Sequence, residues 1–136
     1  MPPDTGLPLP ALEHFQVSEF RHPELLAHEF LFWLDRVRHA AGVAFKLTSD
    51  GRTPEHNAEV GGAPSSLHLR GRAVDFTVTP WTPEALARVL VAVCLTPTPQ
   101  SVGWELELVA GPQDKHVHLG LRAEPGLPNR CVLALD

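Results

Sequence analysis

Polar residues that can bind metal or move protons alternate with apolar ones late in the chain. In segment 115–121 the apolar members are expected to face inward, and they are Val117, Leu119 and Leu121. Successive side chains of a strand point to opposite faces of a sheet. The residues expected together on the other face are Asp114, His116 and His118.

A carboxylate and a third histidine come from an earlier strand and the loop before it. Asp75 stands among apolar neighbours in segment 72–79, and His68 precedes it by seven positions in a glycine-containing loop. Two imidazoles and one carboxylate from this group would form a zinc ligand set. Such a set leaves a fourth position open for water, which is typical of catalytic zinc. The alternatives are that the histidines only make hydrogen bonds within the fold, and that Asp75 only bonds a nearby backbone amide.

The spacing of apolar residues, together with capping residues, glycines and prolines, predicts the helices and strands that must position these residues. Apolar residues at spacings of three and four predict a helix over 24–41, closed by Gly42. Thr53 and Thr82, each followed by proline, predict the starts of a short helix and of a second long helix. Cys94 is expected on the inward face of that second helix. Strands are predicted at 45–48, 72–79, 102–109, 116–122 and 132–135.

This order predicts an α+β domain with helices on one face of a mainly antiparallel sheet. The chain has 136 residues, of which 43% are hydrophobic, enough for one domain with a real core. Residues 1–12 contain four prolines and are expected to form an extended N-terminal segment. Residues 13–136 would form the domain, which we expect to be a monomer.

The charge excludes some partners. Eleven lysines and arginines stand against sixteen aspartates and glutamates, a formal charge of −5, so no basic surface for nucleic acid is expected. No apolar run approaches a membrane span, and the N-terminus does not resemble a secretion signal. We therefore expect no membrane association and a protein that is cytoplasmic as synthesised.

The residues around His68 and Asp75 follow a longer pattern. Segment 66–75 reads Ser-x-His-x-x-Gly-x-Ala-x-Asp, and it resembles the zinc signature of the D-Ala-D-Ala carboxypeptidase and phage endolysin metallopeptidases. Further segments of the chain are similar to other parts of that family, namely 14–20, 49–57, 61–63, 102–104 and 117–119. The resemblance runs from about residue 14 to 122 and implies the hedgehog/D-Ala-D-Ala peptidase fold.

The resemblance implies a role for individual residues. His68, Asp75 and His118 would be the zinc ligands. Arg52 would hold a carboxylate or carbonyl oxygen of the substrate, a task that suits a planar two-pronged donor; a surface salt bridge is its alternative. Ser66 would bond the substrate backbone or cap the loop.

The chain departs from the family pattern at the general base. Many relatives carry an acidic residue three positions before the last histidine, and Lys115 stands there. His116 and Asp114 lie on the expected face instead, as a proton carrier and as a base or orienting residue, although Asp114 would also suit a turn. Glu105 and Glu107 are further candidates, and we expect them to face solvent.

The resemblance implies a zinc peptidase that uses metal-activated water to hydrolyse an amide of a peptidoglycan stem peptide or cross-bridge. Such a protein would be an endolysin released to the cell wall at lysis or a cytoplasmic dipeptidase. The main alternative is a non-catalytic zinc-binding domain of a phage particle or wall-binding protein that has lost its base. A third possibility is a fragment of a larger wall-targeting protein.

Overall fold

A five-stranded sheet organises the molecule. Its strands are β1 (Ala44–Ser49), β2 (Ala73–Thr79), β3 (Trp104–Ala110), β4 (Lys115–Leu121) and β5 (Arg130–Leu135). The order across the sheet is β1-β2-β4-β3-β5, and only β5 runs parallel to its neighbour, β3. The computed structural model describes residues 12–135, so the extended segment predicted for residues 1–12 lies outside the described residues except for Leu12.

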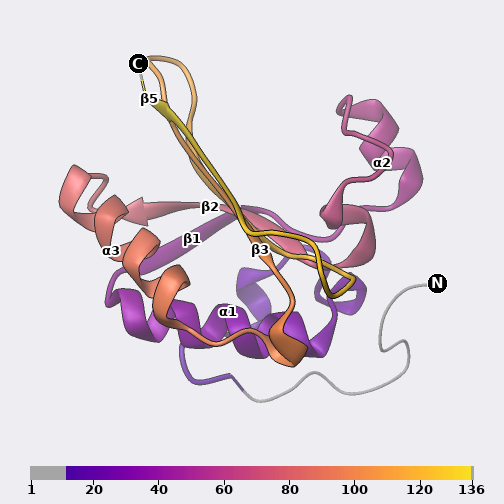
Figure 1. Cartoon of the computed structure of the whole chain (residues 1–136). Coiled ribbons are helices and arrows are strands. Elements are labelled where there is room, and N and C mark those ends of the chain that lie inside the picture. Colours follow the sequence, from indigo (N-terminus) through magenta and orange to yellow (C-terminus); the bar gives the residue numbers. More distant parts are fainter. Residues whose placement is uncertain (1–11, 136) are drawn as a thin grey trace.

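Two long helices lie together on one face of this sheet (Figure 1). They are α1 (His28–Ala41) and α3 (Pro83–Leu95), and the short α2 (Pro54–Glu59) lies apart from both. The predicted α+β class, with helices packed on one face of a mainly antiparallel sheet, is confirmed. Within residues 12–135, no helix is both long enough and apolar enough to cross a bilayer.

The first long helix begins later than predicted. Pro23–Leu25 form a separate 3₁₀ turn, η2, and Leu26 and Ala27 are extended, so α1 starts at His28 rather than at residue 24. The Ala27 N–H donates to the carbonyl of Gly71 at 2.9 Å. A tertiary hydrogen bond therefore replaces the helical one that the periodicity predicted.

The predicted helix boundaries otherwise hold because their capping chemistry is local. The Thr53 hydroxyl accepts from the N–H of His56 at 3.2 Å, and the Thr82 hydroxyl accepts from that of Ala85 at 3.1 Å. Each satisfies a donor that the first helical turn leaves without a partner. Gly42 ends α1 in the left-handed conformation, with φ of 67°.

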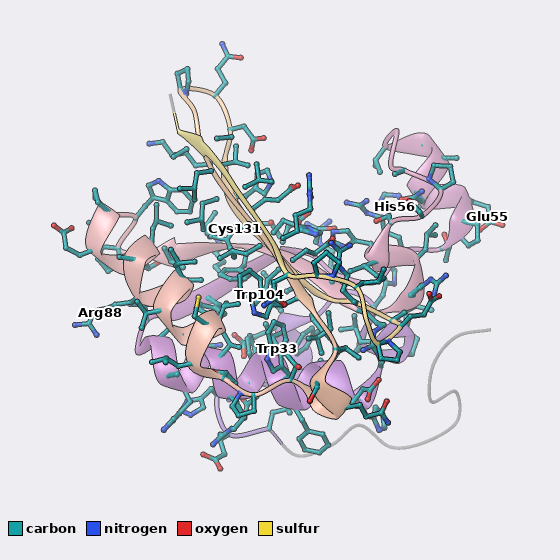
Figure 2. The ribbon with its side chains drawn as sticks, in the orientation of Figure 1. Trp33, Glu55, His56, Arg88, Trp104 and Cys131 are labelled. Atoms are coloured by element: carbon teal, nitrogen blue, oxygen red, sulfur yellow. The ribbon has the colours of Figure 1, made fainter. Side chains whose placement is uncertain are left out.

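The hydrophobic core fills the space between the two long helices and the sheet. Figure 2 shows Trp33 of α1 in this layer, and its side chain is buried. Cys94 is exposed, so the prediction that it faces inward is wrong. The buried face of α3 is centred on Leu86, Val89 and Val93 with Ala85 and Ala92 beside it, and Cys94 lies one helical step beyond.

Candidate metal centre

The register of the sheet places the polar residues of β4 and β2 side by side. His118 pairs directly with Asp75 of β2 on one side and with Glu107 of β3 on the other. Directly opposed residues in an antiparallel pair have Cβ atoms about 4.5–5.5 Å apart. Val117 and Leu119 are fully buried toward the core, so His118 and Asp75 meet on the face that the long helices leave uncovered.

His68 reaches the same point from a 3₁₀ turn before β2, η3 (Leu67–Arg70). The side chain is 3% exposed, and its Nδ1 donates to the carbonyl of Asp50 at 2.7 Å. This bond leaves Nε2 to point at Asp75, whose Oδ1 lies 3.4 Å away. The Asp50 carboxylate accepts from the backbone N–H groups of Arg21 and His22, which fixes the loop that carries the orienting carbonyl.

The turn between His68 and β2 requires glycine at position 71. Gly71 has φ of 67°, a backbone conformation that residues other than glycine rarely adopt. A Cβ there would lie 1.9 Å from the carbonyl oxygen of Leu25. Glycine is therefore needed at position 71 both for this backbone conformation and for close packing against the segment that precedes α1.

The three side chains predicted as ligands converge. The Nδ1 of His118 lies 2.9 Å from Oδ1 of Asp75, and one ligand atom from each of His68, Asp75 and His118 lies within 4.8 Å of the others. A tetrahedral site with bonds of ~2.0–2.1 Å holds neighbouring ligand atoms ~3.3 Å apart. The donor set and its spacing therefore fit a divalent ion held by Nε2 of His68, a carboxylate oxygen of Asp75 and Nδ1 of His118.

Glu105 of β3 also belongs to this centre. Its Oε1 lies 2.7 Å from Nε2 of His118, and its Oε2 accepts from Arg122 at 3.3 Å. Only 13% of the side chain is exposed, so the prediction that Glu105 faces solvent is wrong. The physical reason is the strand order: β3 pairs with β4, so residues on its outer face lie beside those of β4 and not at an open edge.

These contacts set the protonation of the metal-free centre. Burial disfavours the charged form of His118, but hydrogen bonds to Asp75 and Glu105 outweigh it and raise the pKa of His118 to about 9. Burial likewise opposes ionisation of Asp75, yet hydrogen bonds from His118 and His68 hold its pKa well below the usual range. The hydrogen bond to His118 also lowers the pKa of Glu105. Without metal, an imidazolium at His118 lies between two carboxylates.

Arg52 borders the centre beside the second oxygen of Asp75. Its Nη2 lies 3.8 Å from Asp75 Oδ2, while Nη1 and Nη2 make contacts of 3.4 Å with Asn57 and Ser49. These contacts are long, so the guanidinium keeps capacity for a further acceptor. Ser66 Oγ accepts from the N–H of His68 at 3.2 Å, which is the capping role of the two predicted for it.

The two residues predicted to act as general base lie at the start of β4, with His116 on the strand and Asp114 just before it. His116 Nδ1 lies 2.9 Å from Oδ1 of Asp114, as the predicted face requires. Lys115, which lies between them in the sequence, is exposed, and the alternation along β4 places it on the other face of the strand from His116. His116 and Asp114 therefore form a pair in the structure, and the pair uses Nδ1 of His116 and not Nε2.

A pocket of about 580 Å³ contains the centre, open to solvent. His68, Asp75 and His118 line it together with Arg52, Ser66 and His116. Charged side chains of both signs also line it, from Arg70, Glu105, Glu107, Arg122, Glu124 and Arg130. A pocket lined in this way suits a polar or charged ligand better than an apolar one.

Sequence reasoning missed two contributions to this site. The Asp50 carbonyl orients His68, and the only signal for it is that Asp50 lies in the segment 49–57 noted for its resemblance. The contact of Glu105 with His118 is the second contribution. Alternation along β3 predicts the face on which Glu105 lies, but it does not predict which strand lies beside that face.

Comparison with known proteins gives one family. No curated protein matches the chain. The profile of the Peptidase M15 family matches residues 11–119, which contain His68, Asp75 and His118, the three residues of the candidate metal centre. With a matching fold and this extent of match, the chain belongs to the Peptidase M15 family, the zinc D-Ala-D-Ala carboxypeptidase and endolysin-type peptidases.

Proposed function

We propose that the protein is a zinc peptidase that hydrolyses an amide bond in peptidoglycan stem peptides or cross-bridges. The observation that carries this proposal is the convergence of His68 Nε2, Asp75 Oδ1 and His118 Nδ1 at an open pocket in a Peptidase M15 chain. Three protein ligands and an accessible fourth position are what a catalytic zinc requires.

A zinc ion held by His68, Asp75 and His118 would polarise the scissile carbonyl and lower the pKa of water. The proton from the attacking water needs an acceptor, and His116 is the proposed one. Asp114 accepts from Nδ1–H of His116, which leaves Nε2 to take the proton and to return it to the leaving amine. Glu105 bonds the outer nitrogen of His118, so its proposed role is to position that ligand and not to act as base.

Arg52 is the proposed substrate anchor. It lies beside Asp75 at the pocket wall, and its two Nη groups make only long contacts. A carboxylate or carbonyl oxygen of a stem peptide would accept from both prongs of the guanidinium. Ser66 lines the same wall, and its hydroxyl could donate to the substrate while its oxygen continues to cap η3.

Hydrolysis of purified peptidoglycan tests this function. The wild-type protein loaded with zinc should release new amino groups and defined muropeptides, and His68→Ala should release none. His56→Ala is the matched control, because His56 is an exposed histidine of α2 and should leave the activity unchanged. Elemental analysis should show that His68→Ala has lost the tightly held zinc.

One feature favours a second candidate, a zinc-binding domain without catalysis. Lys115 occupies the position where many relatives carry the acidic base, and its side chain is exposed. If the wild-type protein holds zinc in this centre and still releases nothing from peptidoglycan, the peptidase proposal is wrong and the binding domain remains.

A further inference from the structure

A second group of metal-binding side chains lies outside the pocket. His14 precedes the first 3₁₀ turn, and His39 lies in the last turn of α1. His14 Nε2 is 2.9 Å from Nδ1 of His39, and Glu13 Oε2 is 3.9 Å from the same nitrogen of His14. One ligand atom from each residue lies within 4.8 Å of the others. None of the three lines the pocket that holds His68, Asp75 and His118.

The backbone that carries this group is held in place by a buried carboxylate. Asp35 of α1 is 4% exposed, and its two oxygens accept from the N–H groups of Glu13 at 3.1 Å and of His14 at 2.9 Å. Phe15 follows at once, is 5% exposed and packs against Phe20 and Phe45. Because His39 is on α1 as well, the three Cα positions are fixed relative to one another before any ion binds.

The donor set fits a borderline divalent ion. Two imidazole nitrogens and a carboxylate are ligands of Zn²⁺, Cu²⁺ and Ni²⁺. A tetrahedral ion would hold the two nitrogens ~3.3 Å apart, a few tenths of an ångström beyond their present separation. Glu13 and His39 are exposed, so small rotations of their side chains can make this change, and waters can complete the coordination.

Arg36 is a cation in contact with this group, and its partners decide whether Glu13 is free to bind. Its Nη2 lies 3.2 Å from Glu13 Oε2 and also 3.2 Å from Asp35 Oδ2. If Glu13 turns to a metal ion, Arg36 keeps its contact with Asp35. Its positive charge repels a bound cation, so this group should bind more weakly than the buried centre in the pocket.

We propose that Glu13, His14 and His39 form a second site for a divalent ion of the zinc, copper and nickel group. The ion would connect the segment before the first 3₁₀ turn to the C-terminal end of α1. The proposal does not depend on peptidase activity, since it uses none of the residues of the pocket.

Zinc titration against a chromophoric chelator tests it in a background that lacks the first site. His68→Ala should bind one Zn²⁺ per chain, and His68→Ala/His39→Ala should bind none. The control His68→Ala/His56→Ala should still bind one. His56 has a carboxylate neighbour, Glu59 at 3.7 Å, and it lies on α2, away from α1 (Figure 2).

Thermal unfolding provides a second readout. Zinc should raise the Tm of His68→Ala, because an ion that binds only the folded state stabilises it, and the rise should vanish in His68→Ala/His39→Ala. His39→Ala alone should hydrolyse peptide as the wild type does. The proposal is overturned if His68→Ala binds no zinc, or if the double variant with His39→Ala still binds one. Failure of the peptidase proposal would look different, since the wild type would then hold zinc without hydrolysing peptide.

Discussion

Removing the negative charge of Glu105 should weaken the metal centre without dismantling it. In Glu105→Gln the amide oxygen can still accept from Nε2–H of His118, so the ring keeps its orientation while the carboxylate charge is lost. Outer partners of metal-bound histidines typically contribute 10–100-fold in metal affinity. We expect about a 10-fold loss for Glu105→Gln, or ~1.4 kcal/mol, and a loss toward 100-fold for Glu105→Ala.

The matched control is Glu107→Gln. Glu107 lies on the same strand, lines the same pocket and directly opposes His118, but its carboxylate bonds Arg130 at 2.9 Å. Zinc affinity should be measured by chelator competition in the His39→Ala background, so that only the pocket centre contributes. Glu105 does not support the metal centre through its charge if Glu105→Gln binds zinc as tightly as its parent, or if Glu107→Gln weakens binding equally.

Three further outcomes follow from the same structure. His116→Gln should lower kcat on peptidoglycan peptides by about 10²–10⁴-fold, the range for a lost general base, and Asp114→Asn should lower it less. Folding raises the pKa of His118 to about 9, so its stabilisation of the metal-free protein is complete below pH ~6.5 and is lost as the pH rises through about 9. Urea unfolding of wild type and His118→Gln should therefore differ most at acidic to neutral pH and converge above pH 9. Gly71→Ala should lower the free energy of unfolding by more than Gly61→Ala, which has a similar φ of 69° but nothing within 4 Å of a new Cβ.

Each outcome has a result that would contradict it. Equal kcat in His116→Gln and wild type would remove His116 from proton transfer. A difference between wild type and His118→Gln that grows above pH 9 would show that the histidine is not held as an imidazolium. Equal unfolding free energies for Gly71→Ala and Gly61→Ala would mean that the contact with Leu25 can relax, since both share the same backbone strain.

Local patterns in the sequence were enough to predict which long helices and strands form, and which face of β4 is polar. Thr53 and Thr82 cap helices because the interaction spans three residues, and Gly42 ends α1 through its own backbone freedom. Alternation places His118 on the polar face of β4 because a strand has a period of two. The order of the pattern around His68 and Asp75 was sufficient to indicate the family to which the chain belongs.

The neighbours of those side chains were decided only by the tertiary structure. Alternation gives the face of a strand but not the strand beside it, and the position of β4 between β2 and β3 is what puts Asp75 and Glu105 on either side of His118. The delayed start of α1 depends on a hydrogen bond from Ala27 to Gly71, forty-four positions along the chain. His14 and His39 likewise meet through the buried Asp35. Contacts between residues so distant in sequence leave no local periodicity, and they exist only once the core has closed.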